Sequence, residues 1–475
     1  MDFMIYDISL LVIFVIFISV FLYRRKTNLK KEGLLLLYRT SWGMRLIDKV
    51  GKKFKRTLNF LSYLAIGLGY LLMGTIIYLF GKIVWVYVLN PQIVRAIKIP
   101  PIMPLIPYLP QAFKLDFLPS FYFIYWIIII AIVAVVHEFA HGIFATNKGV
   151  RIKKTGFGFF PFFLPVFLAA FVELDEEQMK KKSIFSQMSV LAAGTFSNIL
   201  TGIVFFLVMI LFFSLAFAPV GVTFDSYTYS AFPIESVSMI NDVSLESASY
   251  EEIIEHIDGT KIDVVNVGEL IYDNGIAGFS QDTEGNYFIG LYDDAPAINV
   301  GLKGVITEIN GFDINSIEKI SDELLKYSPG EAITITTQLD GETQIYDIVL
   351  DENPTKEGVA FLGIGFSNQQ GSGIIRALIS KISSFKKPHI FYEAKFEAGE
   401  FIYNLLWWLV MVSFSIALVN MLPVGLFDGG RFFYLTILAI TKKEKIAKRA
   451  FSIITYFFLA LLAVIMVFWA ISVFG

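Results

Sequence analysis

Two histidines and a glutamate stand together in a strongly apolar part of the sequence. Residues 136–142 read V-H-E-F-A-H-G, and the unbroken apolar run 127–136 leads directly to the first histidine. In a helix, positions i and i+4 lie on one face, so His137 and His141 can bind the same metal ion. Glu138 lies beside them, where its carboxylate can take a proton from a metal-activated water. This H-E-x-x-H spacing is typical of zinc hydrolases.

The same residues could instead be core histidines that match the motif by chance. The chain has only four histidines, which makes a chance match rare. Ionisable side chains within a membrane span are also costly unless they are paired, and a metal ion would pair all three. Because the chain has no cysteine, any metal must be bound by histidine and carboxylate. We therefore predict a metal site, and we infer Zn²⁺ from the types of ligand.

A catalytic zinc needs a third protein ligand and an open position for water. His256 falls in an acidic segment and His389 follows Lys386-Lys387-Pro388, so we expect both histidines to be solvated. Acidic residues are nearly absent from the other apolar segments, which leaves Asp428 as the candidate third ligand. Its alternative role is a cap or turn residue before a new helix.

The composition of the chain places this site in a membrane protein. The 475 residues are 55% hydrophobic and only 17% charged, whereas a soluble protein carries about 25% charged residues. A bilayer core requires about 20 apolar residues in a helix. Six segments meet this requirement, which predicts a polytopic α-helical membrane protein. They are 4–22, 59–89, 121–147, 184–218, 401–422 and 450–474.

The charges divide the chain into a basic membrane part and an acidic insert. Residues 220–370 contain 27 acidic and 5 basic residues. The loop after the first span carries twelve basic residues, and the loops 148–183 and 441–449 are also basic. By the positive-inside rule these loops are cytoplasmic, so we expect the insert to be extracytoplasmic and the chain to be a multi-pass protein of the cell membrane.

Four parts of the chain follow from these boundaries. Residues 1–58 contain the first span and its basic loop, and residues 59–219 contain the H-E-x-x-H helix. Residues 220–370 form the insert, and residues 371–475 return to the membrane. Within the second part, residues 152–175 form two apolar, aromatic runs broken by glycine and proline, which predicts a membrane-associated β-hairpin.

The insert has the order of strands and helices of an α+β domain. Residues 305–311 predict a strand and a turn, residues 316–327 an amphipathic helix, and residues 332–337 an alternating strand. This order resembles a PDZ domain. Residues 237–247 echo residues 306–316 at a constant offset, so the insert contains either one such unit or two in tandem.

Taken together, these motifs resemble those of the site-2 protease family of intramembrane metalloproteases. The resemblance rests on H-E-x-x-H at 137–141 and on N-x-x-P-x-x-x-x-D-G, which begins at Asn420 and includes Asp428. It extends to Gly194 and Asn198 in the fourth span and covers most of the chain. The absence of cysteine and the compact length resemble archaeal members of the family more than animal ones.

The resemblance implies a role for each matching residue. His137, His141 and Asp428 would bind one Zn²⁺ per chain, and Glu138 would be the general base. Asn420 and Asn198 would contact the backbone of the substrate or steady the site, and the alternative for Asn198 is helix packing.

The resemblance also implies the class of substrate. The substrates would be single-span membrane proteins already shortened by another protease, and the hairpin would present them as extended strands. The insert would exclude bulky substrates or bind a newly cut terminus. We expect the lipid bilayer as a partner and no nucleic acid. The alternative function is a non-enzymatic membrane protein, either a metal transporter or a scaffold for the acidic module. A transporter would need further ligands along a pathway, and the spans lack them.

Overall fold

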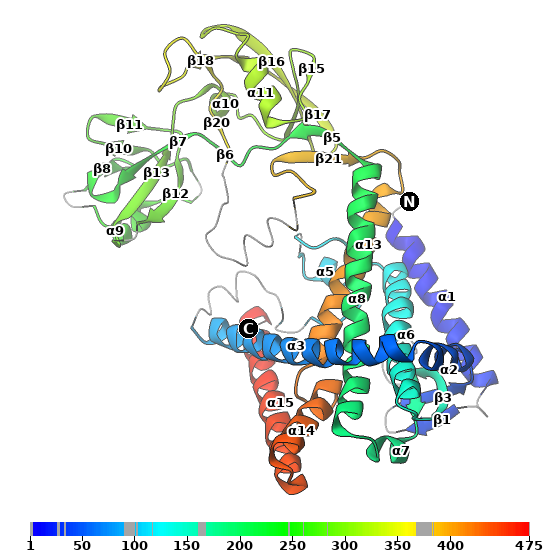
Figure 1. The fold of residues 1–475 in the computed structure, drawn as a ribbon. Helices are drawn as coiled ribbons and strands as arrows, with labels where there is room; N and C mark the ends of the chain where they lie inside the picture. The colour runs from blue at the N-terminus through cyan, green and yellow to red at the C-terminus, as the bar shows by residue number, and fades with distance from the viewer. Residues whose placement is uncertain are drawn as a thin grey trace. The chain divides into compact units, whose positions relative to one another are not determined.

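The chain folds into two compact units. The computed structural model describes residues 3–25, 29–32, 35–89, 100, 103–115, 117–159, 168–245, 248–259, 261–282, 284–366, 382 and 384–474. The first unit combines Met1–Phe212 with Glu400–Gly475, and the second unit is Phe213–Gly399 (Figure 1).

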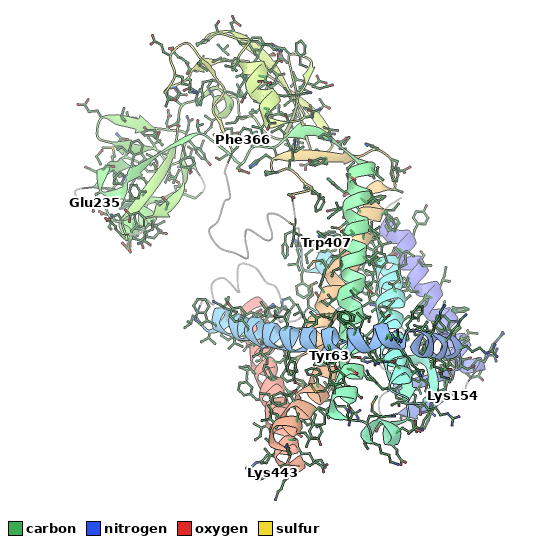
Figure 2. All side chains as sticks on the ribbon, in the orientation of Figure 1. Tyr63, Lys154, Glu235, Phe366, Trp407 and Lys443 are labelled. Carbon is green, nitrogen blue, oxygen red and sulfur yellow. The ribbon has the colours of Figure 1, made fainter. Side chains whose placement is uncertain are left out.

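Six of the described helices are long and apolar enough to cross a membrane. They confirm the six predicted spans, with ends that differ by a few residues. Many apolar side chains on these helices are exposed, such as Tyr63 on the second of them, labelled in Figure 2. Lipid is the solvent that accepts such a surface. The helices are α1 (Phe3–Arg24), α3 (Lys55–Leu89), α6 (Phe123–Asn147), α8 (Ile184–Ala216), α13 (Gly399–Asn420) and α15 (Glu444–Phe474).

A four-stranded antiparallel sheet belongs to the same unit as these helices. The predicted hairpin is present as β3 (Ile152–Phe159) paired with β4 (Leu168–Leu174), and residues 160–167 lie outside the described part. Two strands that we did not predict, β1 (Leu29–Glu32) and β2 (Leu35–Thr40), extend the sheet in the order β1-β2-β3-β4. They lie in the basic loop after the first span. We interpreted this loop from its charges alone and did not assign its short apolar run, residues 34–37, to a strand. Strand β4 is therefore an edge strand.

Short helices complete the first unit. Helix α2 lies between β2 and α3, α7 follows β4, and α14 lies between the last two spans. Their bounds are α2 (Met44–Lys53), α5 (Leu109–Ala112), α7 (Glu176–Lys180) and α14 (Asp428–Thr441).

The amino-terminal end of α6 is capped by a carboxylate from another span. Asp7 on α1 is 2% exposed. Its Oδ2 accepts hydrogen bonds from the Phe123 N–H at 2.6 Å and from the Tyr108 hydroxyl at 2.6 Å, and its Oδ1 accepts from the Ile124 N–H at 3.0 Å. The positive end of the helix dipole stabilises this anion. Burial and the Asp7 carboxylate raise the pKa of the Tyr108 hydroxyl above its usual range, so Tyr108 keeps its proton.

The second unit contains two similar modules, each with its own apolar core. The first module has a sheet of order β11-β10-β8-β9, and the second has the corresponding order β17-β16-β14 with β15 paired to β14. In the chain, a helix follows β9 in the first module and β15 in the second module. The elements are β8 (Val237–Ile240), β9 (Val243–Ser244), α9 (Tyr250–His256), β10 (Val265–Val267) and β11 (Leu270–Tyr272), then β14 (Val305–Ile309), β15 (Phe312–Asp313), α11 (Ile317–Leu324), β16 (Ala332–Leu339) and β17 (Glu342–Val349).

An asparagine in a left-handed turn recurs in both modules. Asn241 and Asn310 have φ of 46° and 49° and follow β8 and β14. The Asn241 Oδ1 accepts a hydrogen bond from the Val264 N–H, and the Asn310 Oδ1 accepts from the Thr334 N–H. The echo between residues 237–247 and 306–316 thus corresponds to a repeated local structure.

The remaining strands and short helices of the second unit join or flank these modules. They are β5 (Phe217–Val222), β6 (Ser226–Tyr227), β7 (Tyr229–Pro233), η2 (Ile234–Ser236), β12 (Ile276–Gln281), β13 (Tyr287–Tyr292), α10 (Pro296–Asn299), β18 (Asp351–Glu352), β19 (Ala360–Phe361), β20 (Ile364–Gly365) and β21 (Ile390–Ala394).

The cap on α6 leads to the first prediction. In Asp7→Asn the side chain keeps its shape but presents an NH₂ group where one of the three donors needs an acceptor. We expect the variant to be less stable by about 1–3 kcal/mol, the usual cost of a buried donor without a partner. Thermal unfolding of the full chain in detergent measures this as a lower Tm. The matched control is Asp48→Asn, because Asp48 forms an exposed i,i+4 ion pair with Lys52, where little stability is lost. Equal Tm values for Asp7→Asn and the wild type would contradict the prediction.

Candidate active site

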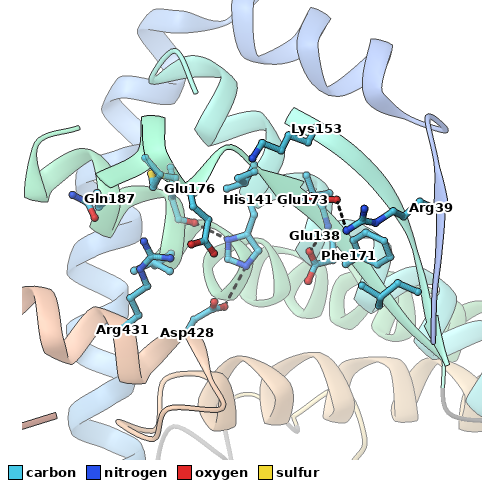
Figure 3. Close-up of a pocket in the computed structure, with 16 residues that line it drawn as sticks. Arg39, Glu138, His141, Lys153, Phe171, Glu173, Glu176, Gln187, Asp428 and Arg431 are labelled. Atoms are coloured by element: carbon cyan, nitrogen blue, oxygen red, sulfur yellow. Dashed lines mark hydrogen bonds and ion pairs between the residues drawn. The ribbon is translucent and has the colours of Figure 1, made fainter. Parts of the chain in front are cut away.

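The two histidines of the motif lie on one face of α6, as their spacing predicts. The His137 side chain is 10% exposed and the His141 side chain 12% exposed. Their Nε2 atoms are 3.0 Å apart. The Asp428 carboxylate, from the first turn of α14, lies against both: its Oδ2 is 3.3 Å from the His137 Nε2 and 3.2 Å from the His141 Nε2. Figure 3 shows Asp428 beside the His141 ring.

These three atoms have the spacing of ligands on one face of a tetrahedron. A tetrahedral zinc with bonds of about 2.0–2.1 Å has ligand atoms about 3.3–3.4 Å apart. The observed separations of 3.0, 3.2 and 3.3 Å are close to that value. Two imidazole nitrogens and one carboxylate oxygen also form a donor set that zinc accepts.

The other ring nitrogen of each histidine shows which tautomer is present. The His141 Nδ1 is 2.7 Å from the Val190 carbonyl oxygen, which can only accept a hydrogen bond. The Nδ1 therefore carries a proton, which leaves the Nε2 beside the Asp428 carboxylate as the nitrogen that can bind a metal ion. This arrangement of a carbonyl, a histidine and a free Nε2 is the usual environment of a metal-binding imidazole.

Asn198 occupies the corresponding position behind His137. Its side chain is fully buried, and its amide lies 3.1 Å from the His137 Nδ1. The Asn198 Oδ1 has no hydrogen-bond partner within the described part of the chain. Turning the amide by 180° places this oxygen on the His137 Nδ1–H and satisfies both groups. In that arrangement the His137 Nε2 is likewise the ring nitrogen that can bind a metal ion, and it lies with the His141 Nε2 and the Asp428 Oδ2 around one position.

Gly194 lets α8 approach the histidines closely. A Cβ at this position would lie 2.4 Å from the His141 Nε2 and 2.5 Å from the His137 Cε1. Contacts this short do not occur, so any larger residue would displace the imidazoles. The resemblance singled out Gly194, but only the structure shows that its missing side chain makes room for the site.

The turn before α14 places Asp428. The residue before Asp428, Phe427, is the N-cap of α14, so Asp428 is not the cap that the alternative interpretation required. A Cβ on Gly429 would lie 2.4 Å from the Met421 backbone, and one on Gly430 would lie 2.3 Å from the Val424 carbonyl oxygen. The two glycines allow the helix to begin tight against the preceding turn, which directs the Asp428 carboxylate toward α6.

Glu138 lies beside the three converging atoms. Its ligand oxygen and the two imidazole nitrogens all lie within 4.8 Å of one another. The Glu138 Oε2 accepts a hydrogen bond of 3.0 Å from the Val172 N–H on β4. The carboxylate is therefore held next to the candidate metal position by the edge strand, a contact that the sequence did not predict.

A cavity of about 730 Å³ opens beside these groups (Figure 3). Nine of its sixteen lining residues are polar or charged, and they include the ion pair between Arg39 and Glu173, whose closest atoms are 3.2 Å apart. Water can occupy a cavity of this size and polarity. The lining residues are Leu37, Arg39, Glu138, His141, Lys153, Phe171, Val172, Glu173, Leu174, Glu176, Met179, Gln187, Val190, Leu191, Asp428 and Arg431.

The two asparagines that the resemblance implied have different surroundings in the structure. Asn198 supports His137 and is fully buried, which favours the steadying role over direct contact with a substrate. Asn420 is the last residue of α13 and is not among the residues that line the cavity. The Val190 carbonyl and the Val172 N–H were missed, because backbone groups leave no signal in the residue types.

Comparison with known proteins agrees with this geometry. A search of curated protein sequences finds no significant match. The family model described as peptidase family M50 matches residues 125–465, more than two thirds of the chain. This match includes α14 and all but the first two residues of α6, and it confirms the family that the motifs predicted. The chain therefore belongs to peptidase family M50, the site-2 protease family of membrane metallopeptidases.

Proposed function

We propose that this protein is an intramembrane zinc endopeptidase that cleaves the transmembrane segments of single-span membrane proteins. One observation carries the proposal: the His137, His141 and Asp428 ligand atoms converge to within 3.0–3.3 Å of one another among apolar spans. Membership of a family of membrane metallopeptidases supports the reaction class.

Each proposed ligand has a partner that orients it. The Val190 carbonyl holds His141, Asn198 holds His137, and the turn before α14 holds Asp428. A zinc ion bound by these residues would polarise the scissile carbonyl and lower the pKa of the attacking water. Fixed ligands lower the cost of assembling such a site, because little reorganisation accompanies binding.

Glu138 would act as the general base and then as the general acid. Its carboxylate would take a proton from the attacking water and deliver it to the nitrogen of the leaving amine. The hydrogen bond from the Val172 N–H fixes the Glu138 Oε2 and leaves the other oxygen available for this transfer. A base held in place by a backbone group needs no side-chain rearrangement before it reacts.

Strand β4 would hold the substrate in an extended form. A transmembrane helix hides its peptide bonds, so it must unwind locally before cleavage, and its freed N–H and C=O groups then need partners. Strand β4 is at the edge of its sheet and lines the cavity beside Glu138. The outward N–H of Val172 and the alternation of a strand place the N–H of Ala170 on the same free edge. Pairing with this edge would bring a substrate strand alongside the metal ligands.

We propose that the site opens toward the cytoplasm. Its cavity is lined by Arg39 and Lys153, which belong to the two basic loops that the positive-inside rule assigns to that side. The insert would then be extracytoplasmic. Its repeated strand–turn–strand–helix order, with α10 and α11 in the second module, supports two PDZ-like units. These units would limit access to substrates already shortened by another protease, by excluding bulky substrates or by binding a newly cut terminus.

The proposed base is tested by Glu138→Gln. The variant keeps the metal ligands but cannot accept the proton, so we expect cleavage of a single-span substrate in detergent to fall about 10²–10⁴-fold. Elemental analysis should still find near one zinc per chain. Asp428→Ala is the complementary variant and should lose both zinc and cleavage. Cleavage by Glu138→Gln at the wild-type rate would refute the base, and normal zinc content in Asp428→Ala would refute the third ligand.

The close approach of α8 predicts a loss of metal from a residue that is not a ligand. Gly194→Ala adds one methyl group that collides with both imidazoles, so we expect the zinc content to fall well below that of the wild type. Gly74→Ala is the matched control, because nothing lies within 4 Å of a Cβ at this position. Both variants replace a glycine in a span by alanine. Full zinc content in purified Gly194→Ala would contradict the prediction, because the histidines could then shift without losing their affinity for zinc.

The pairing of substrate with β4 is tested at Ala170. Ala170→Pro removes the outward N–H while proline remains tolerated at an edge strand. We expect slower cleavage of a transmembrane substrate, by roughly fivefold to tenfold for one lost hydrogen bond, with unchanged zinc content. Ala170→Val keeps the N–H and serves as the control. If the two variants cleave at the same rate, the free edge of β4 does not bind the substrate.

A further inference from the structure

Helix α2 packs closely against the segment of α6 that contains the motif. Ile47 is fully buried, and a Cβ on Gly142 would lie 2.9 Å from its side chain. A Cβ on Gly51 would lie 2.8 Å from the Ile143 carbonyl oxygen and from the Thr146 side chain. Gly51 of α2 thus lies close to the backbone of α6 at Ile143, two residues beyond His141.

The opposite face of α2 is cationic and exposed. Ile47 and Gly51 lie on the buried side, and on the other side of the helix Arg45, Lys49 and Lys53 are exposed. Residues 44–56 contain six basic residues and one acidic residue, a net charge of +5. The acidic residue, Asp48, pairs with Lys52 at the same surface.

Large apolar side chains border this cationic face. Trp42 is 59% exposed, Leu46 is 55% exposed and Phe54 is 47% exposed. A helix that combines exposed cations with exposed apolar anchors is typical of the interface between a membrane and water. The membrane span α3 begins at Lys55, two residues after α2 ends, which places α2 at that interface. The positive-inside rule accounts for the basic residues of the loop but not for their position on one face beside apolar anchors.

We propose that α2 binds the anionic headgroups of phospholipids at the membrane surface and that this binding steadies the motif segment of α6. Anionic headgroups complement the cationic face of α2, because each basic residue near an anionic membrane contributes about 1 kcal/mol of attraction. The membrane surface also fits by shape, because the apolar anchors can enter the interface while the cations meet the phosphates. The contact through Gly51 carries the effect to α6. The effect on cleavage rests on the proposed function, whereas headgroup binding does not.

The first experiment measures hydrogen exchange of the α2 amides. The full-length protein is placed in nanodiscs of phosphatidylcholine, alone or with one quarter phosphatidylglycerol. We expect exchange over residues 44–53 to slow by about threefold or more in the anionic discs. The variant Lys49→Gln/Lys52→Gln/Lys53→Gln should lose this response. Equal exchange in the two kinds of disc for the wild type would overturn the proposal.

A matched control separates α2 from surface charge in general. The variant Lys442→Gln/Lys443→Gln/Lys445→Gln removes three exposed lysines at the junction of α14 and α15, where Figure 2 labels Lys443. It should respond to anionic lipid as the wild type does. If it loses the response as the α2 variant does, the binding site is not α2. If soluble polyglutamate protects α2 in neutral discs as fully as anionic lipid does, the surface fits an acidic protein, and the lipid assignment is wrong.

The second experiment measures cleavage in the same discs. We expect the wild type to cleave a single-span substrate about threefold faster in anionic discs, and the α2 variant to cleave equally in both. Slower exchange of α2 without faster cleavage would overturn the link to α6. Absence of cleavage in every disc would refute the proposed function, while the exchange measurements would still test headgroup binding.

Discussion

The structure depends on bringing two imidazoles and a carboxylate together within an apolar environment. Each of these groups is costly to bury alone, and a carboxylate and two imidazoles about 3 Å apart are stabilised when a proton or a metal ion lies among them. The surrounding groups are arranged to keep the lone pairs pointing inward: Val190 fixes the His141 tautomer, and Asn198 lies against the His137 Nδ1. These neighbours would therefore raise the affinity of the proposed site for a metal ion, because its ligands need little rearrangement.

The sequence predicted the parts of this site that are visible as residue types. The apolar runs predicted the six spans, and the scarcity of other intramembrane acids pointed to Asp428. Residues 152–175 predicted a hairpin because glycine and proline interrupt two apolar runs. Each of these predictions rests on a local sequence pattern or on a count of residues. Patterns and counts can be read without knowing which elements lie next to one another.

The parts that the sequence did not predict are tertiary. Strand β2 pairs with β3, more than a hundred residues away, and β1 pairs with β2, so both strands join a sheet whose other half lies far along the chain. The Val172 N–H that holds Glu138 is a backbone group, and its role follows only from β4 being an edge strand. In the insert, one turn recurs with Asn241 and Asn310 in equal roles, although the two modules share too few residues for the echo alone to establish a repeat.

Glycines show how the supporting helices are held near α6. Gly51 on α2 and Gly194 on α8 both face the motif segment or its histidines at distances that exclude a side chain. Glycine within a helix costs about 1 kcal/mol relative to alanine, so its presence at both contacts indicates that close approach matters more here than helix propensity. The amino-terminal end of α6 is held by Asp7, and its carboxyl-terminal half lies between these two glycine contacts. A helix fixed at both ends can keep His137 and His141 in position beside a cavity that admits water, where a looser bundle would let the imidazoles turn away from each other.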